Sequence, residues 1–104
     1  MLNEDAISRV QEMETILNGC RAELDALSEA IGRYADLLQE QRKLFRYYGS
    51  LEWHADREAD EDGELPCNLP RGVLSEDAVY DLITDSLDTA DRMQELSEEI
   101  RMGL

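Results

Sequence analysis

The sequence has few of the residue types from which metal, redox and disulfide-stabilised sites are built. Its 104 residues include one histidine, two cysteines and six aromatic residues, of which one is tryptophan. One histidine and one nearby thiol do not complete the four ligands of a zinc site. The two cysteines, Cys20 and Cys67, lie far apart, and such spacing predicts free thiols in a reducing compartment. We therefore expect no cofactor and no disulfide framework.

Long hydrophobic runs are also missing. No apolar stretch approaches the ~20 residues that a membrane-spanning helix needs. The first five residues, Met-Leu-Asn-Glu-Asp, are acidic and lack the apolar core of a signal peptide. These two features predict a cytoplasmic protein with no membrane partner.

Positive charge is scarce. Lys and Arg total 10 against 25 Asp and Glu, which gives a net charge of -15. Such a surface repels phosphate backbones and anionic lipids, so direct nucleic-acid binding is not expected. A basic protein is the electrostatically natural partner. The apolar fraction of 42% is ordinary for a folded protein and argues against global disorder.

The main feature that is present is a long heptad seam. Its apolar residues recur at alternating spacings of three and four, which average 3.5 and are typical of a helix that packs on another helix. Gln41 is the one polar exception. The spacing predicts a helix over about 3–48, with Asn3 as its N-cap. The seam residues are Ala6, Val10, Met13, Leu17, Cys20, Leu24, Leu27, Ile31, Tyr34, Leu38, Phe45 and Tyr48.

The dipeptide Asn18-Gly19 is a turn signal inside this predicted helix. A turn there would shorten the first helix and give a three-helix bundle. The seam keeps its phase from Leu17 to Cys20 to Leu24, which a turn has no reason to preserve. A continuous helix is therefore favoured, with the bundle as the alternative.

After the helix, the residues at 49–74 predict an irregular acidic connection. Gly49 is the expected C′ residue, and Ser50 caps a short helical turn. Two prolines and a solvated acidic run follow. A second helix is predicted over about 76–102, capped by Ser75, with an apolar stripe on one face and carboxylates on the other.

These elements predict one all-α domain, residues 1–104, built as a long antiparallel helical hairpin. The second helix is too short to cover the N-terminal seam, whose residues Ala6 to Leu17 remain without an intramolecular partner. An exposed apolar stripe is typical of a binding surface, and the simplest closure is a homodimer. At the closed end we expect the aromatic residues Tyr34, Tyr47, Tyr48, Trp53 and Tyr80 to converge.

Two segments carry a family resemblance. Residues 47–53 read YYGSLEW, and residues 72–82 read GVLSEDAVYDL. The chain resembles a family of small bacterial proteins defined only as a domain of unknown function, number 4298. The resemblance implies a mainly helical, cytosolic bacterial protein. It supplies no activity and no catalytic residues.

The acidic connection holds the best candidate for chemistry. Glu58, Asp60 and Asp62 match the first three ligand positions of an EF-hand loop, but Pro66 and Leu69 occupy the ninth and twelfth positions, where the match fails. A metal or catalytic site would be assembled from His54, Asp56, Glu58, Asp60, Asp62 and Cys67.

No catalytic signature stands in the sequence, so the protein is predicted not to be an enzyme. The favoured function is a non-enzymatic, acidic helical module for protein–protein interaction. Two alternatives stay open: the metal or catalytic site in the His54–Cys67 loop, and a DNA mimic that occupies a nucleic-acid-binding protein.

Overall fold

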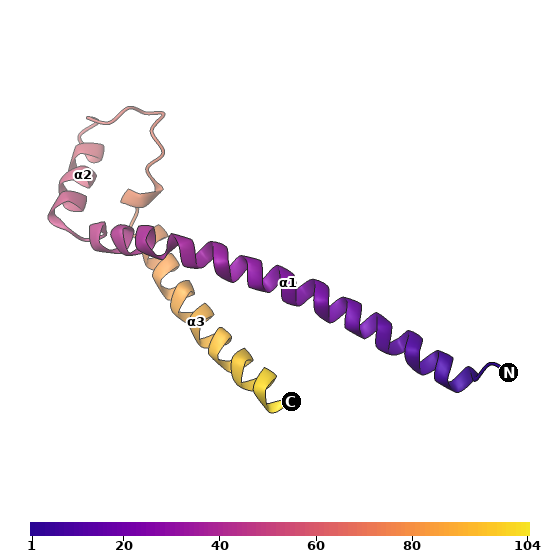
Figure 1. The fold of residues 1–104 in the computed structure, drawn as a ribbon. Helices are drawn as coiled ribbons and strands as arrows, with labels where there is room; N and C mark the ends of the chain where they lie inside the picture. The colour runs from indigo at the N-terminus through magenta and orange to yellow at the C-terminus, as the bar shows by residue number, and fades with distance from the viewer. The chain divides into compact units, whose positions relative to one another are not determined.

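The computed structural model describes all 104 residues and is all-α, as predicted. Its elements, in order, are α1 (Glu4–Tyr47), α2 (Leu51–Glu61), the 3₁₀ turn η1 (Gly72–Leu74) and α3 (Ala78–Met102) (Figure 1). There is no β-strand. None of the helices combines the length and the apolar content needed to cross a membrane.

Helix α1 is continuous for 44 residues, so no turn forms at Asn18-Gly19. The side chain of Asn3 caps it, because its Oδ1 accepts the backbone N–H of Ala6 at 3.0 Å. Gly49 follows the helix with φ +79°, a left-handed conformation that glycine adopts without steric cost. The chain thus leaves α1 where the sequence places its C′ glycine.

Helix α2 differs from the irregular connection expected over 49–74. Ser50 caps a full helix of 11 residues, because its Oγ accepts the N–H of Trp53 at 3.2 Å. Glu52 lies in the first turn, where a carboxylate favours the helix dipole, and Arg57 pairs with Glu61 at 3.7 Å. The sequence pattern predicts only a short turn here. Trp53 is the only buried residue of α2, so the helix has no apolar stripe from which its length could be predicted.

Helix α3 begins at Ala78, two residues later than predicted. Ser75 still binds the first turn of the helix, since its Oγ accepts a hydrogen bond from the N–H of Ala78 at 3.2 Å. The same hydroxyl donates to the carbonyl of Gly72 at 2.7 Å. The hydroxyl thereby joins η1 to α3. The helix ends at Met102, before Gly103.

The chain divides into two compact units, residues 1–39 (unit one) and residues 40–104 (unit two). Unit one consists of the N-terminal part of α1, and α1 contains no buried residue. Unit two holds the end of α1, α2, η1 and α3, in which η1 contacts both α2 and α3. Its core is Trp53, Leu74 and Val79, with 4%, 7% and 3% of their surfaces exposed. The pairing of α3 along α1, as in a hairpin, stays a prediction.

Candidate functional site

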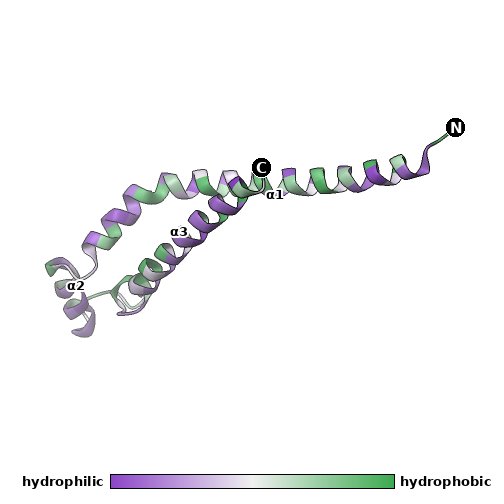
Figure 2. Ribbon diagram, turned by 90° about the horizontal axis from the view of Figure 1, so that it is seen from below, coloured by the Kyte–Doolittle hydropathy of each residue, from purple (hydrophilic) through white to green (hydrophobic).

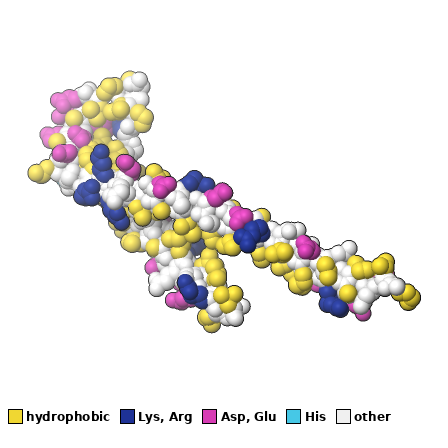
Figure 3. All heavy atoms as spheres, viewed as in Figure 1, with side chains coloured by type: hydrophobic (Ala, Val, Ile, Leu, Met, Phe, Trp, Pro, Cys, Tyr) yellow, Lys and Arg dark blue, Asp and Glu magenta, His cyan; other side chains and the backbone are white.

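The heptad seam of α1 is exposed. Along unit one, hydrophobic side chains lie uncovered on the helix surface, as the visible face in Figure 3 shows. Nothing within unit one covers this stripe. Its large members are Val10, Met13, Leu17, Leu24, Leu27, Ile31 and Tyr34, which are 37% to 60% exposed.

The stripe is wider than the seam read from the sequence. Ile16 and Leu37 are also exposed, at 50% and 56%, and each precedes a seam residue, Leu17 or Leu38. They add a third apolar position to the heptad at those points, a pattern typical of helices that pack in bundles. The periodicity contained this signal, but a strict two-position heptad overlooks it. We call the seam residues from Ala6 to Leu38, together with Ile16 and Leu37, the α1 stripe.

Helix α3 shows the same division into an apolar and an acidic side. Figure 2 shows hydrophobic and hydrophilic residues recurring along both long helices. No residue of α3 takes part in an ion pair; the five ion pairs of the chain all join residues that precede α3. The acidic side of α3 therefore faces solvent without cationic partners. Its carboxylates are Asp81, Asp85, Asp88, Asp91, Glu95, Glu98 and Glu99.

A small corner, which we define as residues 47–79, organises unit two. The rings of Tyr48 and Trp53 meet edge to face with centroids 5.4 Å apart. Trp53 Nε1 donates to the carbonyl of Val73 at 2.9 Å, and the Tyr48 hydroxyl donates to the carbonyl of Glu76 at 2.8 Å. These bonds hold the end of α1 and the start of α2 against the approach to α3.

The aromatic convergence expected at this end is only partly present. Tyr48 and Trp53 meet, whereas Tyr80 is 58% exposed and Tyr34 lies in unit one. Arg57 also lies beside the indole. Its guanidinium lies 5.4 Å from the centre of the Trp53 ring and pairs with Glu76 at 3.0 Å. A cation over the indole face adds a cation–π attraction to the ion pair.

The proposed metal-site residues do not come together. No group of three or more His, Cys, Asp or Glu side chains lies in a geometry that could hold a metal ion. Glu58 and Asp60 lie within α2 rather than in a loop, and residues two apart on a helix point to nearly opposite sides. His54 lies against the Trp53 ring, 5.0 Å between centroids, and Cys67 is an exposed free thiol.

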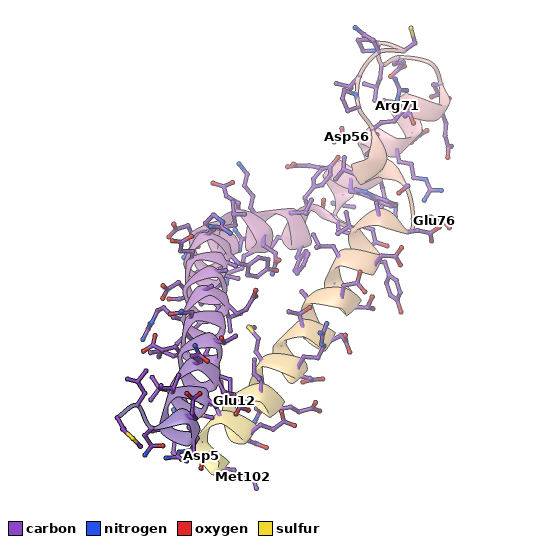
Figure 4. All side chains as sticks on the ribbon, turned by 90° about the vertical axis from the view of Figure 1, so that its right-hand side faces the viewer. Asp5, Glu12, Asp56, Arg71, Glu76 and Met102 are labelled. Atoms are coloured by element: carbon purple, nitrogen blue, oxygen red, sulfur yellow. The ribbon has the colours of Figure 1, made fainter.

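One of the candidate carboxylates, Asp60, has a structural partner instead. It pairs with Arg71, and the same guanidinium donates to the carbonyls of Pro66 and Leu69. Arg71 thus ties the proline-containing connection to α2. Figure 4 shows Arg71, Asp56 and Glu76 on the elements of the corner. This role has no signature in the sequence, because an arginine that binds backbone carbonyls has no local motif.

A surface hollow lies where α1 ends and α2 begins. Lys43 and Arg46 line it beside Glu40 and Glu52. No polar side chain of the chain is buried, and no buried polar atom lacks a hydrogen bond. The charged side chains of the hollow are therefore all solvent-accessible, and none is a buried polar group of the kind that orients a small substrate in a pocket.

A second candidate carboxylate, Asp56, binds a tyrosine of the corner. The Tyr47 hydroxyl donates to Asp56 Oδ2 at 2.7 Å. This hydrogen bond is the main cause that raises the pKa of Tyr47 from 10.0 to about 12, with desolvation and the negative charges of Asp56 and Glu52 adding to it. The bond requires a protonated tyrosine, so its contribution to stability is present below pH 10 and is lost as the pH rises toward 12.

This pKa can be measured by following tyrosinate absorbance as the pH is raised. We expect Tyr47 to give an ionisation step near pH 12, and Tyr47→Phe to remove that late step. Asp56→Asn should move that step down toward the ordinary pKa of about 10, because the charged acceptor is gone. Glu58→Gln, a carboxylate loss on the same helix, is the matched control and should leave it in place. A late step that survives Tyr47→Phe would contradict the assignment.

The comparisons with known proteins give one match. The sequence matches the family described as domain of unknown function DUF4298 over residues 10–96. Comparisons with curated proteins and with solved structures find no match. The matched range covers most of the chain, from the α1 stripe through the corner to the last turns of α3. The chain therefore belongs to the DUF4298 family of domains of unknown function.

Proposed function

We propose that the protein is a non-enzymatic cytoplasmic interaction module that works by pairing its α1 stripe with a helix of another molecule. One observation carries this proposal: α1 is 44 residues long and buries none of them. Helices in proteins gain most of their stability from packing an amphipathic face. A helix whose continuous apolar face packs against nothing therefore lacks the main source of helix stability.

The internal contacts of α1 do not replace packing. Arg21 pairs with Asp25 at 3.3 Å and Arg33 with Glu29 at 4.0 Å, and all four side chains are at least 60% exposed. Exposed pairs of this spacing contribute about 0.3–0.5 kcal/mol each. Burying the exposed half of one large aliphatic side chain contributes roughly 1 kcal/mol, and the stripe offers several such side chains.

The acidic side of α3 supports a second contact, with a basic protein. Its carboxylates form no ion pairs within the chain, so they remain available for a cationic surface and would steer its approach. The same carboxylates also suit the DNA-mimic alternative, in which the basic partner is a nucleic-acid-binding protein. The metal-site alternative has less support, because Asp56 and Asp60 are held by Tyr47 and Arg71.

Sedimentation equilibrium over a wide range of protein concentration tests the pairing. We expect the molar mass to rise from that of the 11.9 kDa chain to twice this value as concentration increases. Helix content measured by circular dichroism should rise in parallel, because pairing stabilises α1. A mass of one chain at every concentration would contradict self-association.

A further inference from the structure

We propose that the α1 stripe is covered by the α1 stripe of a second copy that runs antiparallel to it, with Leu24 facing the partner's Leu27. This inference rests on the proposed function and specifies the partner and its orientation. It follows from the charge along α1, the charge of unit two and the register of the stripe.

Charge changes sign along α1. Residues 4–29 hold seven Asp and Glu and two Arg, a net charge of -5, whereas residues 30–47 hold two acidic and four basic residues, a net charge of +2. The basic residues Arg42, Lys43 and Arg46 form no ion pairs in the chain. An antiparallel pair places each basic end beside an acidic end, and a parallel pair places like charges together.

Unit two adds a second electrostatic argument. It holds 17 acidic and seven basic residues, a net charge of -10. The chain enters unit two at the C-terminal end of α1. In a parallel dimer, both copies of unit two would therefore begin at the same end of the paired helices. The antiparallel dimer starts them at opposite ends of the paired helices, which reduces the repulsion between two strongly acidic bodies.

The heptad pattern selects the register. Antiparallel helices interdigitate when the two seam positions of one chain face the two seam positions of the other in reverse order. With Leu24 opposite the partner's Leu27, every seam position from Ala6 to Phe45 faces a seam position. Ile16 then lies beside the partner's Leu37, so the two residues that widen the stripe cover each other.

Registers shifted by one heptad are less favourable. A shift in one direction would require Tyr48 to pack against the partner's seam, but Tyr48 is already bound to Trp53 and Glu76 in the corner. A shift in the other direction brings Arg21 beside the partner's Arg21 and Glu23 beside the partner's Glu23. The register centred on Leu24 avoids both conflicts.

Disulfide trapping tests the orientation, because Cys20 is a seam residue with an exposed thiol. All variants carry Cys67→Ser to remove the other thiol, and oxidised glutathione is the oxidant. In the proposed register Cys20 faces the partner's Ile31. The variant Ile31→Cys should therefore form covalent dimers, in which mass spectrometry identifies a disulfide between Cys20 of one copy and the thiol introduced at position 31 of the other.

Leu38→Cys is the matched control, since it also places a second thiol on the seam. In the proposed register its thiol lies one heptad from the partner's Cys20, about 10.5 Å along the axis. A disulfide needs Cα atoms within about 7 Å, so this variant should give few dimers. With Cys67→Ser alone, Cys20 has no thiol opposite and should also remain unlinked.

Three outcomes would overturn the inference. Efficient Cys20–Cys20 linkage in the Cys67→Ser protein shows a parallel dimer, and linkage through Leu38→Cys shows another register. Both results leave self-pairing through α1 intact. No linkage in any variant, together with a single-chain mass by sedimentation, would remove the self-pairing itself.

Discussion

Trp53→Ala is expected to unfold the corner. The indole is 4% exposed and is the largest of only three buried side chains in unit two. Truncating a buried tryptophan to alanine costs about 3–5 kcal/mol. The substitution removes the edge-to-face contact with Tyr48, the hydrogen bond to the carbonyl of Val73 and the cation–π contact with the Arg57 guanidinium. A unit with so small a core has little stability in reserve.

Hydrogen exchange resolves this effect by region. In Trp53→Ala, amide protection should fall in peptides covering α2 and residues 72–79, while peptides from unit one keep their wild-type exchange. Trp53→Phe retains a ring and removes the donor to Val73, so it should cost about 1–3 kcal/mol. The matched control is His54→Ala, which truncates the exposed neighbour. Equal protection in Trp53→Ala and His54→Ala would show that the indole is not the core.

Leu24→Glu is expected to abolish self-association. Leu24 is 50% exposed in the chain and lies in the central layer of the proposed dimer. The substitution therefore buries two carboxylates, one from each copy, and each of them faces the partner's Leu27. An uncompensated buried charge costs about 3–5 kcal/mol. One such penalty raises the Kd by more than roughly a hundredfold, and the dimer contains two.

Sedimentation equilibrium of this variant is best compared with Ala22→Glu. Ala22 lies on the opposite side of α1 from the seam, and it is exposed. Both variants gain one negative charge, so a general effect of charge would weaken association equally. We expect Ala22→Glu to dimerise nearly as the wild type does and Leu24→Glu to remain a single chain. Equal association of the two variants would place the interface elsewhere.

The long helices could be predicted from the sequence because their signals are periodic. The α1 seam repeats over six heptads, and its phase across Asn18-Gly19 indicated the continuous helix that the structure has. Caps at Asn3 and Ser50 were recognisable because a side-chain oxygen at a helix start is a local feature. The all-α class follows from these elements.

The meeting of Tyr48 and Trp53 was expected, but the polar contacts of the corner could not be predicted, because they join residues that no periodicity relates. Arg71 reaches Asp60 and two carbonyls, and Tyr47 reaches Asp56. Once these partners are known, the acidic run is no longer a free cluster of ligands, because Asp56, Asp60 and Glu61 each bind a local donor. The stripe itself was predictable from the heptad, whereas Ile16 and Leu37 lie outside the two seam positions and are not part of a strict two-position pattern.

The short sequence distances within the corner have a kinetic consequence. Its hydrogen bonds between elements span 9, 20 and 28 residues, so the loops that must close are small and their entropy cost is modest. Helical proteins, in which most contacts lie within the helices, fold rapidly, in microseconds to milliseconds. Docking of two chains is slower and depends on concentration. A newly made chain would therefore complete its corner alone and first, and the proposed pairing of α1, as a docking step between two chains, would follow it.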